Sequence, residues 1–156
     1  MTNNDILRRL RFITKFNDEK MVNVFILGGV SVNLEQVNSW LKKDDHPEYE
    51  FLEDSYFINF LNGLVINFRG KKDDGPAPVE KKVDNNLILK KIKITFTLDS
   101  NSMLEIFKLA DFKISKHELS AFFRKPGHKN YRECKDQILR NFLNGLQQFE
   151  SDEREG

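Results

Sequence analysis

The sequence predicts an all-α protein, a tandem duplication of a four-helix unit with about eight helices in a pseudo-twofold arrangement. The first observation is an internal repeat: at an offset of 82 residues, residues 3–64 align with residues 85–146 without a gap. The hexapeptide NFLNGL, which occurs at 59–64 and again at 141–146, sets this register. The second observation is the helical spacing of the apolar residues in each copy, and the third is that no stretch shows the strict alternation typical of strands.

The repeat divides the chain into four segments. Residues 1–68 form the first helical repeat and residues 85–149 the second. Between them, residues 69–84 are rich in Gly, Pro and alternating charge and lack apolar periodicity, which predicts an exposed linker. The last segment, residues 150–156, is interpreted as a frayed acidic tail.

The first two helices of each copy are predicted from apolar stripes and from helix-start residues. The second helix is short and starts at Asn17 or Asp18 in the first copy and at Asp99 in the second. The residues expected to face the core are Ile6, Leu7, Leu10, Ile13, Met21, Val24, Phe25 and Leu27 in the first copy, and Ile88, Leu89, Ile92 and Phe96 in the second.

The third and fourth helices surround a predicted loop. The third helix starts with a capping-box spacing from Ser115 to Glu118, and Asn33 to Gln36 has the same form. Pro47 and the segment PGHKNY then indicate a loop before the fourth, longest helix. The predicted core residues are Val37, Trp40, Leu41, Phe57, Phe60, Leu61 and Leu64, matched by Leu119, Phe122, Phe123, Leu139, Phe142, Leu143 and Leu146.

Composition favours a cytoplasmic globular protein. Hydrophobic residues make up 39% and charged residues 31% of the chain. No apolar run has the length of a membrane span, and the N-terminus has no signal-peptide pattern. Cys134 is the single cysteine, so no intramolecular disulfide is expected.

Charge is distributed unevenly along the chain. Residues 1–66 contain 7 basic and 10 acidic residues, whereas residues 85–149 contain 12 basic and 6 acidic residues. The formal net charge of +1 therefore does not argue against an anionic partner.

The sequence resembles the bacterial YehS-like family, whose repeat is known as domain of unknown function 1456. The stretches that carry the resemblance are NDILRRLRF, WLKK, FLNGLVINFRGK, NNLILKKIKI and PGHKNYRECKDQILRNFLNGL, and it covers roughly residues 2–149. It implies an all-helical duplicated fold in a bacterial cytosol. It supplies no established activity and no catalytic residues.

No residue pattern points to catalysis, so the sequence predicts a protein that is not an enzyme and has no cofactor and no metal site. Cys134 and His128 have the residue types of a thiol nucleophile and its base, but Leu52 at the equivalent position favours a buried structural thiol. Asp54 and Asp136 are equivalent residues near the start of the fourth helix, where capping is the expected role. Clustered zinc ligands and a Gly-rich phosphate loop are both absent from the sequence.

Nucleic acid, either DNA or RNA, is the leading predicted partner. In the first copy, the second helix, the turn LGGVSVN and the third helix LEQVNSWLKK have the lengths of a helix-turn-helix, although small helical domains contain many such corners. The segment FFRKPGHKNYREC adds a basic cluster with aromatic residues, a composition that contacts phosphates and stacks on bases. A solvated basic loop, or a charge complement to the acidic first copy, is the alternative interpretation. The candidate contact residues are Arg124, Lys125, His128, Lys129, Tyr131, Arg132, Lys42 and Lys43.

A protein adaptor is the alternative function, with a partner helix bound in a groove between the repeats. In the first NFLNGL, Gly63 flanks the apolar face and would let another helix approach closely, whereas Asn59 and Asn62 point away from the core. These amides are expected either to bond linker or loop backbone, or to line the repeat interface or the groove. The candidates at this surface are Asn59, Asn62, Gly63, Asn141, Asn144 and Gly145. The oligomeric state stays open.

Overall fold

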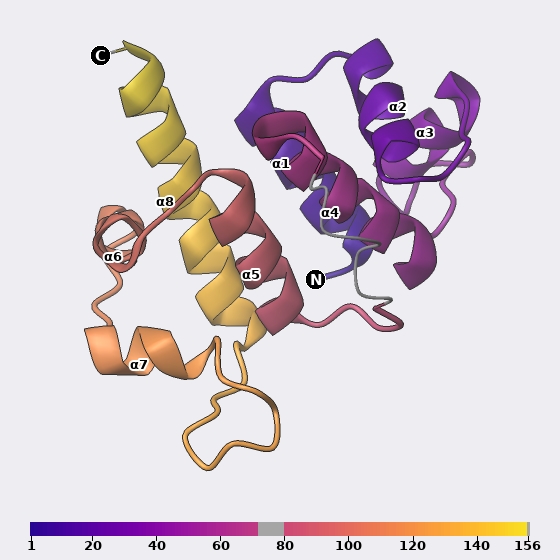
Figure 1. Ribbon diagram of the computed structural model, residues 1–156. Coiled ribbons are helices and arrows are strands. Elements are labelled where there is room, and N and C mark those ends of the chain that lie inside the picture. Colours follow the sequence, from indigo (N-terminus) through magenta and orange to yellow (C-terminus); the bar gives the residue numbers. More distant parts are fainter. Residues whose placement is uncertain (72–79, 156) are drawn as a thin grey trace. The chain divides into compact units, whose positions relative to one another are not determined.

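The computed structural model describes residues 1–71 and 80–155 (Figure 1). This part of the chain contains eight α-helices and no strand, which confirms the predicted all-α duplicated fold. The chain divides into two compact units, Met1–Val83 and Asp84–Gly156. Most of the predicted linker, residues 72–79, lies outside the described residues.

The first unit begins with polar side chains that define where its helices start. Thr2 and Asp5 form a capping box at the start of the first helix, and Asn17 and Asn33 accept hydrogen bonds from backbone N–H groups at the starts of the second and third. The first unit's helices are α1 (Asn3–Thr14), α2 (Asp18–Leu27), α3 (Leu34–Leu41) and α4 (Asp54–Arg69).

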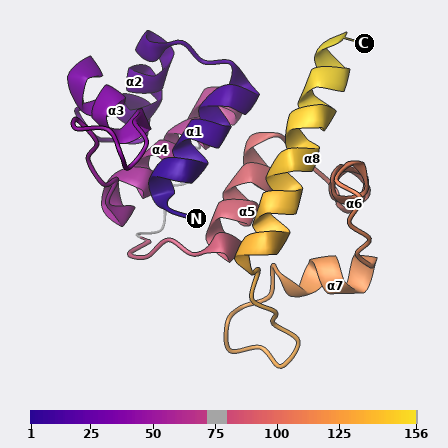
Figure 2. The same ribbon diagram turned by 180° about the vertical axis from the view of Figure 1, so that it is seen from behind.

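The second unit repeats this arrangement. Asp84, Asp99 and Ser115 cap its first three helices, and Ser115 forms the predicted capping box with Glu118. Its helices are α5 (Asn85–Thr95), α6 (Ser100–Leu109), α7 (Lys116–Ala121) and α8 (Asp136–Glu155), and α8 contacts both α5 and α6 (Figure 2).

The predicted frayed tail from residue 150 is wrong, because α8 continues to Glu155. Within this last part of the helix, the Gln148 side chain donates to the Asp152 carboxylate over 2.9 Å, a contact between residues four apart. Such contacts between successive turns stabilise a helix that an acidic composition alone would not predict.

Each unit has its own core, built from the apolar stripes that the sequence predicts. Almost all predicted core residues are buried, but Leu27 is 42% exposed, and Leu41, Phe96 and Phe123 are half-buried. Leu27 differs because, at about 100° per residue, it lies roughly 120° around α2 from Met21, which faces the core.

Two glycines allow close helix packing inside the units. A Cβ atom on Gly63 of α4 would lie 1.9 Å from the Val24 carbonyl oxygen of α2. On Gly145 of α8 it would lie 1.9 Å from the Ile106 carbonyl oxygen of α6. The predicted close approach of another helix is therefore made within each unit, by α2 against α4 and by α6 against α8.

Candidate nucleic-acid interface

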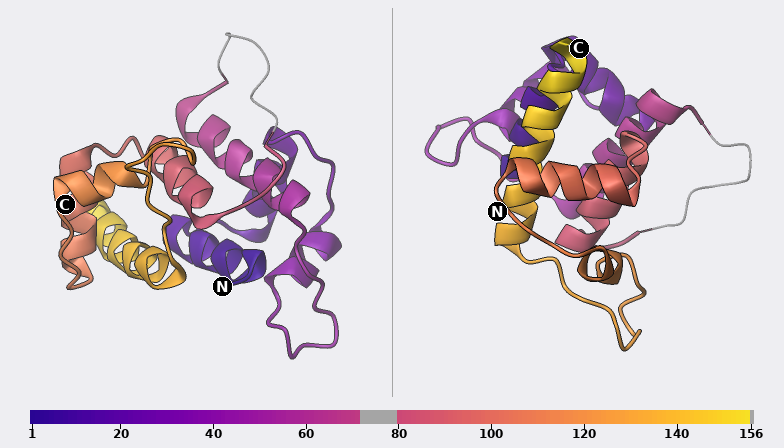
Figure 3. Two further views of the ribbon diagram at one scale, coloured as in Figure 1. Left: turned by 90° about the horizontal axis from the view of Figure 1, so that it is seen from below. Right: turned by 90° about the vertical axis from the view of Figure 1, so that its left-hand side faces the viewer.

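A buried asparagine on α5 closes the loop between α7 and α8. The Asn86 amide nitrogen donates to the carbonyl oxygens of Phe122 (3.0 Å) and Arg132 (2.9 Å), and its amide oxygen accepts the Cys134 N–H (2.9 Å). One side chain thus joins both ends of residues 123–133, and the loop between them projects from the helices of its unit (Figure 3).

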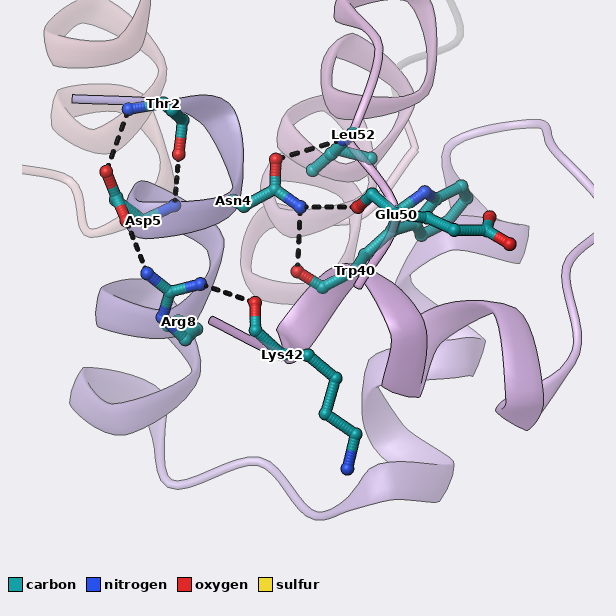
Figure 4. Close-up of polar contacts among 8 residues, drawn as sticks. All are labelled: Thr2, Asn4, Asp5, Arg8, Trp40, Lys42, Glu50 and Leu52. Carbon is teal, nitrogen blue, oxygen red and sulfur yellow. Dashed lines mark hydrogen bonds and ion pairs between the residues drawn. The ribbon is translucent and has the colours of Figure 1, made fainter. Parts of the chain in front are cut away.

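The first unit contains the same arrangement at the equivalent positions (Figure 4). The fully buried Asn4 on α1 donates to the carbonyl oxygens of Trp40 (2.9 Å) and Glu50 (2.8 Å) and accepts the Leu52 N–H (2.9 Å). We call Asn4 and Asn86 the asparagine clamps. Neither residue belongs to the predicted contact residues, although the Asn-Asn pair at the start of each copy is a signal in the sequence.

The neighbouring asparagines hold the carboxylates at the starts of α4 and α8. Asn3 donates to Asp54 over 2.8 Å, and Asn85 donates to Asp136 over 2.7 Å. The bond from Asn85 holds the pKa of Asp136 below its usual value. The capping role predicted for Asp54 is wrong, because the N-cap of α4 is Glu53, which makes no side-chain cap bond, and Asp54 bonds to a neighbouring side chain instead.

A histidine organises the turn within each loop. The His128 N–H donates to the Lys125 carbonyl, the Tyr131 N–H donates to the His128 carbonyl, and the His128 Nδ1 accepts the Asn130 N–H over 3.0 Å. Because Nδ1 accepts, the ring proton of neutral His128 lies on Nε2. The same three bonds occur in the first unit among Lys43, His46, Glu48 and Tyr49.

The second unit's loop exposes cations. Arg124, Lys125 and Lys129 are exposed, as is His128. Arg132 contributes differently, since its guanidinium pairs with the Glu118 carboxylate at 3.1 Å and lies 5.5 Å from the ring centroid of Phe122.

Tyr131 is not an open platform for stacking. Its side chain is half-buried, and burial is the main reason that its pKa is raised above the usual value. Of the residues predicted in this loop, the structure therefore brings Arg124, Lys125, His128 and Lys129 together at the surface, while Arg132 and Tyr131 help to hold the loop.

The equivalent loop of the first unit has the opposite charge. Lys42 is half-buried there and Lys43 is exposed, and four exposed carboxylates follow them, at Asp44, Asp45, Glu48 and Glu50. Where the second unit pairs Arg132 with Glu118, the first unit has a 2.7 Å bond from the Gln36 amide to the Glu50 carboxylate. The two predicted lysines thus lie in an acidic environment on a different unit from the cations of the α7–α8 loop.

The repeated asparagines of NFLNGL make local bonds. Asn59 is half-buried and donates to the Ser55 carbonyl, one turn earlier in α4, so the bond expected from Asn59 to linker or loop backbone is wrong. Asn141 is half-buried and accepts from Gln137, likewise one turn earlier in its helix.

Four other residues are candidates for the repeat interface or the groove, and they divide into two buried glycines and two asparagines nearer to solvent. Gly63 and Gly145 are buried at the helix crossings inside the units, because the packed carbonyl groups leave no room for a side chain. Asn62 is half-buried and Asn144 is exposed, and a role for them at the repeat interface stays a prediction.

The chemistry of the loop residues does not resemble that of a thiol enzyme. Cys134 is buried, as predicted, and burial raises the pKa of its thiol to about 12, so the thiolate needed for nucleophilic attack does not form near neutral pH.

Across residues 1–71 and 80–155, no group of three or more His, Cys, Asp or Glu side chains is placed to hold a metal ion. None of the helices in these ranges is both long and apolar enough to cross a membrane.

Comparisons with known proteins agree with the duplication. A family model described as "Protein of unknown function (DUF1456)" matches residues 3–70 and again residues 85–150. The uncharacterized protein YehS of Escherichia coli (strain K12) is 42% identical over 147 residues, which cover 94% of each chain. No solved structure matches this chain.

Proposed function

This chain belongs to the DUF1456 family of proteins of unknown function, and we propose that it binds nucleic acid through the α7–α8 loop of its second unit. One observation carries the proposal. Two loops with the same clamp and the same histidine turn carry side chains of opposite charge, and the basic one exposes Arg124, Lys125 and Lys129.

The exposed cations suit the phosphate backbone. Within the described residues, none of Arg124, Lys125 and Lys129 forms an ion pair, so each is available to an external anion. Binding of phosphates by such cations releases counterions, which makes the affinity depend on salt. The clamp at Asn86 holds the loop backbone before a ligand arrives, which reduces the entropy lost on binding.

The predicted helix-turn-helix does not contribute to this proposal. The helix in the recognition position is α3 in the first unit, with 8 residues, and α7 in the second unit, with 6 residues, so neither is much longer than two turns. A helix of that length presents few side chains along a major groove. We therefore expect phosphate contacts to dominate and discrimination between base sequences to be weak.

The test is fluorescence anisotropy with labelled random-sequence DNA at about 50 and about 200 mM salt. Three phosphate contacts predict that the logarithm of the affinity falls with that of the salt concentration with a slope of about −2 to −3. The double variant Lys125→Glu, Lys129→Glu is expected to bind at least about tenfold more weakly, because two attractive contacts become repulsive.

The control is the double variant Lys90→Glu, Lys108→Glu, which changes the net charge equally at two other exposed positions of the second unit. It is expected to retain most of the affinity. Equal loss in the two variants, or no detectable binding at the lower salt concentration, contradicts the proposal.

Lys42 and Lys43 are tested by the same assay. Reversal of both is expected to change the affinity less than twofold, because the carboxylates that follow them already repel a phosphate chain. A loss as large as that in the second unit would show that both loops bind.

A protein adaptor is the second candidate, favoured by apolar exposure in the first unit. Leu34 and Phe51 are exposed there, and Leu34 lines an open hollow of about 580 Å³ beside α3. The second copy has Lys116 and Glu133 at these positions. An adaptor predicts salt-tolerant capture of one specific protein, lost when Leu34→Lys and Phe51→Glu introduce the residues of the second copy.

A further inference from the structure

The first unit has an exposed aromatic side chain surrounded by cations. Phe12 of α1 is 64% exposed, the highest value among the exposed large hydrophobic residues of the described chain. It lines a hollow of about 340 Å³ together with Phe16 and the cationic residues Arg8, Arg11 and Lys15.

The rings on this surface form a small cluster. Phe16 stacks on Phe68 of α4 with ring centroids 6.1 Å apart and an interplanar angle of 25°. The Lys20 ammonium group lies 5.9 Å from the Phe16 ring centroid. Phe68 is itself 43% exposed, so the cluster presents ring surface to solvent beside Phe12.

Two of the cations at the hollow are held in place by ion pairs, and the third forms none in the part of the chain that the structure describes. Arg8 pairs with Asp5 and donates to the Lys42 carbonyl (Figure 4), and Arg11 pairs with Asp18. A guanidinium has five N–H donors, so each arginine retains donors after these bonds. Lys15 forms no ion pair within the described residues.

The exposure of Phe12 does not come from an apolar face that awaits a membrane. The apolar residues Ile6, Leu7, Leu10 and Ile13 of α1 are buried in the core of the unit. An interfacial helix needs such a face to insert between lipids, and here the core already uses it. One exposed ring among cations instead matches the pattern of sites where bases stack and phosphates are neutralised.

We infer that the hollow at Phe12 is a stacking site for an unpaired base of single-stranded nucleic acid. Phe12 supplies the ring face, and Lys15 with the remaining donors of Arg11 contacts the adjacent phosphates. A base inside a duplex has no free face, so this site favours single strands. The inference rests on the proposed function for its ligand class but uses residues of the first unit only.

The second copy lacks these groups. The residues equivalent to Phe12, Lys15 and Phe16 are Ile94, Thr97 and Leu98. The stacking site is therefore a property of the first unit, just as the basic loop is a property of the second.

The experiment compares anisotropy of a labelled oligo(dT) of about 15 nucleotides with that of a duplex of the same length. Phe12→Ala is expected to weaken oligo(dT) binding roughly fivefold to a hundredfold and to leave duplex binding unchanged. Phe12→Tyr retains the ring and is expected to bind like the unaltered protein.

Ile26→Ala is the matched control. Ile26 is a large hydrophobic residue of the same unit with 50% exposure, but it lies on α2 and does not line the hollow. It is expected to leave oligo(dT) binding unchanged. Circular dichroism of each variant verifies the helix content, which an exposed ring does not determine.

Several outcomes overturn the inference. These are unchanged oligo(dT) affinity of Phe12→Ala, an equal loss for duplex and single strand, and no binding of oligo(dT) by the unaltered protein. If Phe12→Ala weakens binding to vesicles of phosphatidylglycerol but not to oligo(dT), the surface is assigned to lipid instead. The loop variant Lys125→Glu, Lys129→Glu, measured on the duplex, separates failure of this inference from failure of the proposed function.

Discussion

Thr95 on α5 is a buried residue whose hydroxyl finds no hydrogen-bond partner within the described part of the chain. Its equivalent in the first unit, Ile13, is buried without any polar atom. A buried hydroxyl without a partner costs about 1–3 kcal/mol of folding free energy. Comparison of the two copies thus identifies a buried polar group that lowers the stability of the second unit and that an apolar side chain would avoid.

Thr95→Val is expected to raise the free energy of unfolding by up to about 1 kcal/mol, because it removes the unsatisfied oxygen and keeps the shape of the side chain. The control is Thr14→Val, which is expected to lower it, because the Thr14 hydroxyl donates to the Leu10 carbonyl over 2.8 Å. Urea denaturation measures both. A larger loss for Thr95→Val than for Thr14→Val contradicts the prediction.

At the residue scale, the sequence predicts apolar burial well and polar roles poorly. The burial of Cys134 could be predicted because its equivalent is Leu52. The role of Asn86 could not, because its partners lie 36, 46 and 48 residues away and are backbone groups, which have no sequence signature. The bond between Asn3 and Asp54 likewise joins residues 51 apart, so the position of Asp54 near a helix start indicates only a local cap.

The elements of each unit are joined by a helix crossing that requires glycine. At Gly145, α8 lies so close to α6 that a Cβ atom would overlap the Ile106 carbonyl group. Glycine within a helix costs about 1 kcal/mol relative to alanine, so the close crossing is what favours it here. The sequence predicts that the glycine of NFLNGL lets another helix approach closely, but it does not identify that helix.

Gly145→Ala is expected to lower the free energy of unfolding by about 2 kcal/mol or more, since the gain in helix propensity is smaller than the cost of separating two packed helices. The same change at Gly127, in the exposed loop, meets no atom within 4 Å and is expected to stay within about 0.5 kcal/mol of the unaltered protein. Thermal unfolding compares the two, and equal stability would contradict the assigned crossing.

Helix starts were predicted more accurately than helix ends. Asn33, Asp99 and Ser115 are the N-caps that the sequence indicated, because a cap depends on a local side-chain bond. The end of α8 is harder to predict, because an acidic run is compatible both with a solvated tail and with a helix that is stabilised by contacts such as that of Gln148 with Asp152.

The whole molecule combines one backbone arrangement with two surface chemistries. Both units bury their own apolar residues and use the same clamp, turn and crossing. They differ in the loop charge and in the aromatic surface of α1. The duplication could be predicted from the alignment of the copies, whereas the difference between their surfaces required the exposure of each side chain.

Because each unit has its own core, damage to one is expected to remain local. Gly63→Ala is expected to reduce amide protection in α1, α2 and α4, and Gly145→Ala in α5, α6 and α8. Hydrogen–deuterium exchange read by mass spectrometry distinguishes the two sets of helices. Equal loss of protection in both units from either change would mean that the chain unfolds as one cooperative unit.

The asparagine clamps also have a consequence for protein engineering. Each clamp binds backbone groups only, so it places no demand on the side chains of the loop that it closes. Residues 42–50 and 124–132 are equal in length and share the histidine turn. We therefore expect the two loops to be exchangeable when their partners on the third helix, Gln36 and Glu118, are exchanged with them, so that a chimeric chain carries two basic loops or two acidic ones.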